Sequence, residues 1–213
     1  GPPRGEGTWD DFLKRHATSL WQCDFFSRRI VTPSGLRQAF VLAFIHVQSR
    51  RVILSPATLK PTGAWVDEQA QAFVEQARSQ GLKVAKICRD RDSVYSKTFD
   101  AAVKSKRVEV AQVAFRAPNM NAYAERFVQT IQDECLDHFI VCGTKHFDYL
   151  CGQFLEHYHT ERPHQGLENE VPVRPRKKKL RRAVDPKLAI PKLAAIKCRK
   201  RLGGLLRSYE RAA

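Results

Sequence analysis

The order of apolar and polar positions along the chain predicts strands that alternate with helices. Apolar stretches over 19–29, 37–48 and 51–55 come first, and the short connections between them predict an antiparallel meander. The second stretch is apolar almost throughout, which is typical of a central strand covered on both faces. Two further strands are expected over 84–88 and 108–114.

Helical spacing of apolar residues marks the segments between and after these strands. From about 62 to 80 the apolar positions fall on one face of a helix, and Gly81 is a good stop signal. Other helices are expected over 9–17, 97–105 and 144–159, and one long helix begins near 121. Three strands followed by alternating helices and strands describe an α/β layered domain.

The helix that begins near 121 carries an acid in its first turn. Its apolar stripe consists of Ala124, Phe127, Val128, Ile131 and Leu136. Glu125 lies beside this stripe, where a carboxylate can point out of the scaffold. Pro118 and Asn119 break the chain before the helix, and Asn119 or Asn121 is the expected N-cap.

Two further acids occur where strands are predicted. Asp24 lies within the apolar run 20–26, and Asp90 follows the apolar segment 84–88. An unpaired carboxylate buried among apolar side chains costs several kcal/mol. A divalent metal ion would compensate for that cost, so both acids are candidate metal ligands.

The spacing of these acids and the residues around them form a distinctive pattern. Thirty-four residues separate Asp90 from Glu125. Three short motifs follow one another along the chain: Arg-Asp-Arg-Asp-Ser at 89–93, Asn-Ala-Tyr-Ala-Glu-Arg at 121–126 and Arg-Pro-His-Gln-Gly-Leu at 162–167. Over roughly residues 9–167 the chain resembles the catalytic core of DDE integrases and transposases of the bacterial insertion-sequence type.

This resemblance implies an RNase H-like α/β fold, with a five-stranded mixed sheet flanked by helices and, in this chain, a basic C-terminal extension. It implies metal-dependent phosphodiester cleavage and DNA strand transfer, with two Mg²⁺ or Mn²⁺ ions. Asp24 would bridge both ions, and Asp90 and Glu125 would each complete one site. Asp92 stands where the family has Gly, and it is either a supporting residue or the partner of Arg89 or Arg91.

Charge is distributed unevenly along the 213 residues. The formal net charge is +15, and the segment from 171 onward accounts for +13 of it, with 15 basic and two acidic residues. We therefore expect a leader over 1–18, a catalytic core over 19–168 and a basic tail over 169–213. Residues 196–209 of the tail form either a small hairpin or a broken helix.

Two sets of residues are candidate DNA contacts. The helix that carries Glu125 offers Asn121, Arg126, Gln129 and Gln132, and the alternative is a plain polar helix surface. The tail offers Arg176, Lys177, Lys178, Lys179, Arg181 and Arg182, which would bind phosphates without reading sequence. The alternative for this run is a disordered solubilising tail.

The composition argues against a membrane protein, a secreted protein and a disulfide- or zinc-stabilised protein. The longest apolar runs fall short of the roughly 18 residues of a membrane span, and no signal peptide is evident, so we expect a cytoplasmic, nucleoid-associated bacterial protein. Six scattered cysteines without a C-x-x-C pair argue against a disulfide framework or zinc site. The expected partners are transposon ends, target DNA and further copies of the chain. Two rival functions are a nuclease that hydrolyses without joining and an inactive DNA-binding relic.

Overall fold

The structure is a computed structural model that describes residues 9–90, 97–112, 121–173 and 196–211. The chain divides into two compact units, Gly1–Asp148 and Tyr149–Ala213. The leader up to residue 8, Asp92 with Arg91, and the basic run 176–182 lie outside the described residues, so the hypotheses about them stay predictions.

A five-stranded mixed sheet with the order β3-β2-β1-β4-β5 forms the centre of the first unit. The strands β1 (Leu20–Thr32), β2 (Gly35–His46) and β3 (Val52–Leu54) make the predicted antiparallel meander. The strands β4 (Lys86–Arg89) and β5 (Glu109–Gln112) run parallel to β1. The sequence-based expectation of a mixed five-stranded sheet is therefore confirmed.

The predicted helices are also present. Their bounds are α1 (Trp9–His16), α2 (Gly63–Ser79), α3 (Lys97–Ser105), α4 (Ala122–Glu134) and α5 (Gly143–Thr160). The start of α2 is capped by Thr62, whose hydroxyl accepts a hydrogen bond from the Trp65 N–H. In the described ranges, none of the helices combines the length and apolar character needed to cross a membrane.

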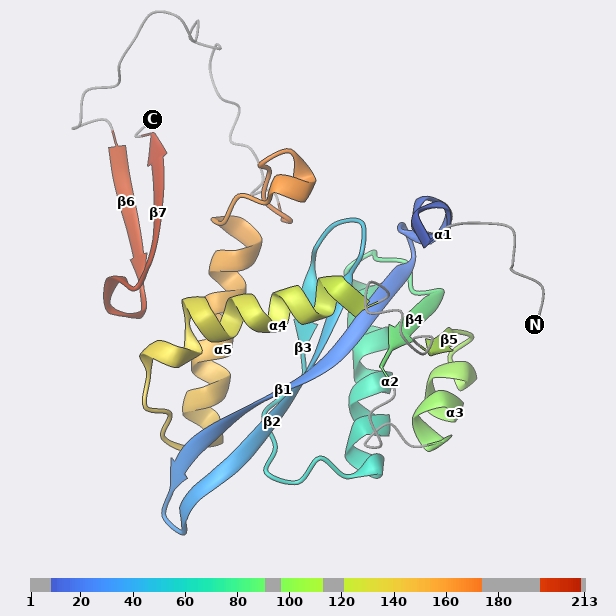
Figure 1. Cartoon of the computed structure of the whole chain (residues 1–213), viewed down its shortest axis with the longest axis horizontal. Helices are drawn as coiled ribbons and strands as arrows, with labels where there is room; N and C mark the ends of the chain where they lie inside the picture. The colour runs from blue at the N-terminus through green and yellow to red at the C-terminus, as the bar shows by residue number, and fades with distance from the viewer. Residues whose placement is uncertain (1–8, 91–96, 113–120, 174–195, 212–213) are drawn as a thin grey trace, which may run out of the picture. The chain divides into compact units, whose positions relative to one another are not determined.

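The two faces of the sheet carry different helices. Successive strand residues point to opposite faces, so Trp21 and Cys23 share one face of β1 and Gln22 and Asp24 share the other. The first face packs against α2 and α3 (Figure 1), in a core of Trp21, Cys23, Leu42, Phe44, Ile53, Val66, Ala70, Phe73, Val74, Ala77, Ile87, Phe99 and Val103. The second face receives α4, which contacts β1 and β2.

The second unit contains a two-stranded hairpin formed by β6 (Ile196–Arg201) and β7 (Leu206–Arg211). The turn between them needs positive φ at Leu202, Gly203 and Gly204, and two glycines tolerate this conformation. Of the two alternatives left open by the sequence, the chain adopts the hairpin, and its strands extend to Arg211.

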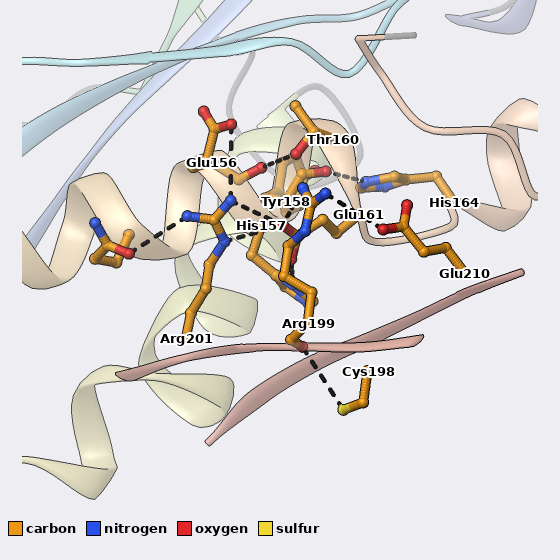
Figure 2. A network of polar contacts seen from close by, with 11 residues as sticks. Glu156, His157, Tyr158, Thr160, Glu161, His164, Cys198, Arg199, Arg201 and Glu210 are labelled. Atoms are coloured by element: carbon orange, nitrogen blue, oxygen red, sulfur yellow. Dashed lines mark hydrogen bonds and ion pairs between the residues drawn. The ribbon is translucent and has the colours of Figure 1, made fainter. Parts of the chain in front are cut away.

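An ion-pair cluster fixes this hairpin to the end of α5 (Figure 2). Glu161 follows α5, and its carboxylate is only 4% exposed. Arg201 of β6 donates from Nε and Nη2 to Glu161 Oε1 at 3.0 and 2.8 Å, and His157 Nδ1 lies 2.9 Å from Oε2. Arg199 Nη1 approaches the same Oε1 at 3.4 Å. The carboxylate thus gathers side chains from two segments that are far apart in the sequence.

The pKa of Glu161 reflects this cluster. Burial alone would raise it, but hydrogen bonds from Arg201, His157 and Ser208 outweigh burial and lower the pKa from 4.5 to about 2. A carboxyl whose pKa is depressed in the folded state stabilises that state above its unfolded pKa. This stabilisation is lost as the pH falls from about 4.5 towards 2.

We predict that the hairpin loosens selectively at low pH. Between pH 6 and 3, the free energy of opening of the β6–β7 amides should fall by on the order of 2 kcal/mol, measured by hydrogen-exchange protection. Glu161→Gln should lower protection at pH 6 and remove most of the pH dependence. Glu210→Gln, an exposed partner of Arg199, is the control and should leave the pH dependence in place. Equal effects of both substitutions would contradict this prediction.

Candidate active site

The register between β1 and β4 places the two strand acids side by side. Gln22 pairs with Cys88 and Cys23 with Arg89 in parallel register, so the next residues along are Asp24 and Asp90. Neighbouring strands lie about 4.8 Å apart, and laterally paired residues share a face. Asp24 and the continuation of β4 at Asp90 are therefore adjacent, at the carboxyl end of β4. Both residues are half-buried.

A buried glutamine joins the helix of Glu125 to this strand. Gln22 is 0% exposed, and its side-chain oxygen accepts hydrogen bonds from the N–H groups of Tyr123 at 2.9 Å and Ala124 at 3.2 Å. These N–H groups belong to the first turn of α4, which has no intrahelical partners for them. Gln22 thus caps α4 from two positions before Asp24, and Glu125 follows directly after the capped residues.

Asn121 makes a second connection between α4 and β1. Its side chain is 1% exposed, and its Nδ2 donates to the Cys23 carbonyl at 3.1 Å. Asn121 stands at the N-cap position, as expected, but its side chain makes no capping hydrogen bond. That function passes to Gln22. The buried Asn121 side chain therefore helps to hold the start of α4 against β1, and its predicted contact with DNA stays a prediction.

Arg89 anchors the segment that ends in Asp90. Its guanidinium is buried and makes a two-pronged hydrogen bond with Asp100 of α3, from Nε at 3.0 Å and from Nη2 at 3.1 Å. Its Nη1 donates to the Asp90 carbonyl at 3.0 Å. The position of Asp90 is therefore tied to α3 as well as to the sheet.

The remaining sequence candidates on α4 differ in exposure. Glu125, Arg126 and Gln129 are exposed, and Gln132 is half-buried. The backbone at Asp24 thus lies beside Asp90 at the carboxyl end of β4, and the first turn of α4, which carries Glu125, is held against β1. Within the described ranges, however, no three His, Cys, Asp or Glu side chains are gathered closely enough to hold a metal ion. Three carboxylates repel one another, so their close approach depends on a cation between them.

His164, Cys88 and Cys135 are buried, which favours structural roles for them. His164, in the Arg-Pro-His motif, is buried, and its Nε2 lies 3.0 Å from the Tyr158 carbonyl. Burial raises the pKa of the Cys88 thiol to about 11 and that of Cys135 to about 12. Such thiols are poor nucleophiles and poor metal ligands at neutral pH.

Residues 106–172 match the family model described as integrase core domain. This part of the chain is therefore similar to the integrase core domain. The matched segment includes α4 with Glu125 and the Arg-Pro-His motif. Comparison with the curated proteins gave no match.

Solved retroviral structures share the fold of this chain. The HTLV-2 integrase catalytic core domain in complex with magnesium aligns with a TM-score of 0.52 at 17% identity, covering 70% of this chain and 91% of that one. A chain of the simian T-cell lymphotropic virus intasome in complex with PP2A regulatory subunit B56 gamma gives a TM-score of 0.54 at 12% identity, covering 92% of this chain and 76% of that one. The BIV integrase catalytic core domain gives 0.50 at 14%, covering 73% and 91%. The predicted RNase H-like fold is confirmed.

Sequence reasoning missed two residues that build this site. Gln22 is a polar residue inside an apolar strand, two positions from Asp24, and that unusual placement was the available signal. The second residue is Arg89, whose ion pair with Asp100 of α3 has no signal in the local sequence.

We predict that Gln22→Leu destabilises the protein by about 1–3 kcal/mol, because the substitution leaves two N–H groups of α4 unpaired in a buried place. Urea unfolding at neutral pH measures the loss. Gln38→Leu is the matched control, an exposed glutamine on β2, and should change stability by less than about 0.5 kcal/mol. A loss no larger at Gln22 than at Gln38 would show that the capping contributes nothing.

Proposed function

We propose that the chain is the catalytic core of an insertion-sequence-type DNA transposase or integrase that cleaves phosphodiester bonds and joins DNA strands. One observation carries this proposal most strongly. The strand register puts Asp24 beside Asp90, and Gln22 holds the start of the Glu125 helix against the same strand. This backbone arrangement supports assigning Asp24, Asp90 and Glu125 to one site, and the similarity of residues 106–172 to the integrase core domain supports it as well.

The donor set fits hard divalent cations. Mg²⁺ and Mn²⁺ prefer oxygen ligands, and all three candidates offer carboxylate oxygens. A further oxygen, Asn121 Oδ1, is buried beside β1 and has no hydrogen-bond partner within the described ranges. When bound, two such ions would activate the attacking hydroxyl and stabilise the leaving oxygen. We assign Asp24 to both ions, and Asp90 and Glu125 to one each.

Other residues of α4 would position the DNA for the reaction. The reaction is an in-line displacement, in which water or a DNA 3′ hydroxyl attacks phosphorus and the bond to the leaving 3′ oxygen breaks. Arg126 and Gln129 are exposed on α4 after Glu125, where they are suited to contact the DNA backbone. Gln132, half-buried, lies at the limit of this surface. The basic run 176–182 would add affinity that is independent of sequence.

The partners follow from the same proposal. They are transposon ends, target DNA and other copies of the chain. In support, one HTLV-2 core is described in a dimeric form, and the simian virus protein belongs to an intasome. The proposed location is the cytoplasm of a bacterium, at the nucleoid.

We expect Asp24→Asn to abolish DNA nicking that depends on Mg²⁺ or Mn²⁺, by roughly 100-fold or more, because the substitution removes a shared ion ligand. DNA affinity, measured in EDTA by fluorescence anisotropy, should stay within about twofold. Asp133→Asn, an exposed acid further along α4, is the control and should keep full activity. If wild-type protein binds DNA yet never nicks it in either metal, the rival inactive binder replaces the enzyme.

Strand transfer is tested separately from cleavage. A labelled duplex with a free 3′ hydroxyl is incubated with supercoiled plasmid, and labelled plasmid reports joining. We expect joined product with wild-type protein and none with Asp24→Asn. Plasmid nicking without any label transfer would favour the rival nuclease that hydrolyses only.

A further inference from the structure

Both faces of the β6–β7 hairpin carry cations, but only one of them also carries acids. Because side chains alternate along a strand, one side, called the inner face, presents Lys197, Arg199, Arg201, Leu206, Ser208 and Glu210. The other side, called the outer face, presents Ile196, Cys198, Lys200, Arg207 and Tyr209. The cations of the inner face lie among acids, whereas the described residues of the outer face include no acid.

The inner face is where the hairpin is held. Arg201 is bound by Glu161, with Glu156 3.8 Å away, and Arg199 lies between Glu161 and Glu210, as Figure 2 shows. Leu206 on the same face is buried. An isolated two-stranded hairpin is only marginally stable in water. The contacts of the inner face therefore supply stability, and the outer face can consist of residues that do not stabilise the hairpin.

The outer face brings two positive charges together. Lys200 and Arg207 are directly opposite each other across the strands, and both are exposed. Both side chains also converge on the turn: Lys200 Cδ and Arg207 Nη2 each lie 3.8 Å from where a Cβ on Gly204 would stand. Arg207 Nε donates to the Gly204 carbonyl at 2.8 Å, which fixes the direction of its guanidinium.

This pair has no compensating charge within the described ranges, where no carboxylate comes within ion-pair distance of Lys200 or Arg207. Like charges directly opposite in a sheet are destabilising. An oriented guanidinium beside an ammonium is a strong arrangement for a phosphate, which accepts hydrogen bonds from both. Tyr209, on the same face and 66% exposed, adds a ring next to the cations.

We propose that Lys200 and Arg207 form a phosphate-binding site for the backbone of double-stranded DNA, held in position by the Glu161 cluster. The choice of DNA as the source of the phosphate rests on the proposed function. The site is separate from the basic run 176–182, because its two cations are arranged by the hairpin rather than by their order in the sequence. It would contribute affinity without reading bases.

The test measures binding of the full chain to a fluorescein-labelled 30-base-pair duplex by anisotropy, in EDTA and at several NaCl concentrations. The double variant Lys200→Gln with Arg207→Gln should bind roughly tenfold more weakly at about 0.15 M salt. The slope of log K against log salt should become shallower by about 2, close to one for each lost phosphate contact. A duplex of unrelated sequence should give the same result.

Lys197→Gln is the matched control, since it removes one positive charge from the same strand but on the inner face. It should change the affinity less than twofold, compared with about threefold for Lys200→Gln alone, and leave the slope unchanged. Hydrogen exchange of the β6–β7 amides confirms that each variant keeps its hairpin. If the control weakens binding as much as Lys200→Gln, or if the folded double variant binds like wild type, the site does not exist.

The two proposals fail in distinguishable ways, because binding in EDTA needs no catalysis. Loss of the salt-slope difference with nicking intact would overturn the hairpin site alone. Absence of nicking with that difference intact would overturn the proposed enzyme and leave the hairpin site standing.

Discussion

The side-chain amide of Gln22 is the interaction on which the rest of the site depends. It sits in the central strand, fully buried, and takes up two N–H groups that the start of α4 cannot pair internally. A polar group in such a place is stable only when its hydrogen bonds are made. The helix therefore cannot move along β1 without leaving three polar groups unpaired. The backbone at Glu125 accordingly keeps a fixed position in space relative to the strand that carries Asp24.

Much of the fold could be predicted because its signals are local. The strands and helices of the first unit follow from apolar periodicity, and α2 ends before Gly81 as its sequence indicates. Local signals also mark the three acids. Asp24 stands within an apolar run, Asp90 follows a predicted strand, and Glu125 lies at a characteristic spacing from Asp90. The structure then adds what periodicity does not contain, namely the register that puts Asp24 beside Asp90.

What could not be predicted depends on contacts between distant segments. The N-cap expectation for Asn121 was sound by residue type, yet the cap comes from Gln22, about a hundred positions upstream. The contact between the buried Arg89 guanidinium and Asp100 on α3 joins two elements, and the sequence around Arg89 gives no sign of it. The clustering of Arg199 and Arg201 on Glu161 is equally invisible to composition, which records only a basic tail.

The alternation of side chains along β1 has a consequence for how this protein can vary. Trp21 and Cys23 face the α2 core while Gln22 and Asp24 face α4, so function and packing occupy alternate positions of the same few residues. Exchanging one side chain there alters one contact. Adding or deleting one residue before Asp24 would reverse the phase, turning the acid towards the core formed with α2 and the tryptophan towards α4. Homologous proteins should therefore differ in this strand by replacement and keep its length unchanged.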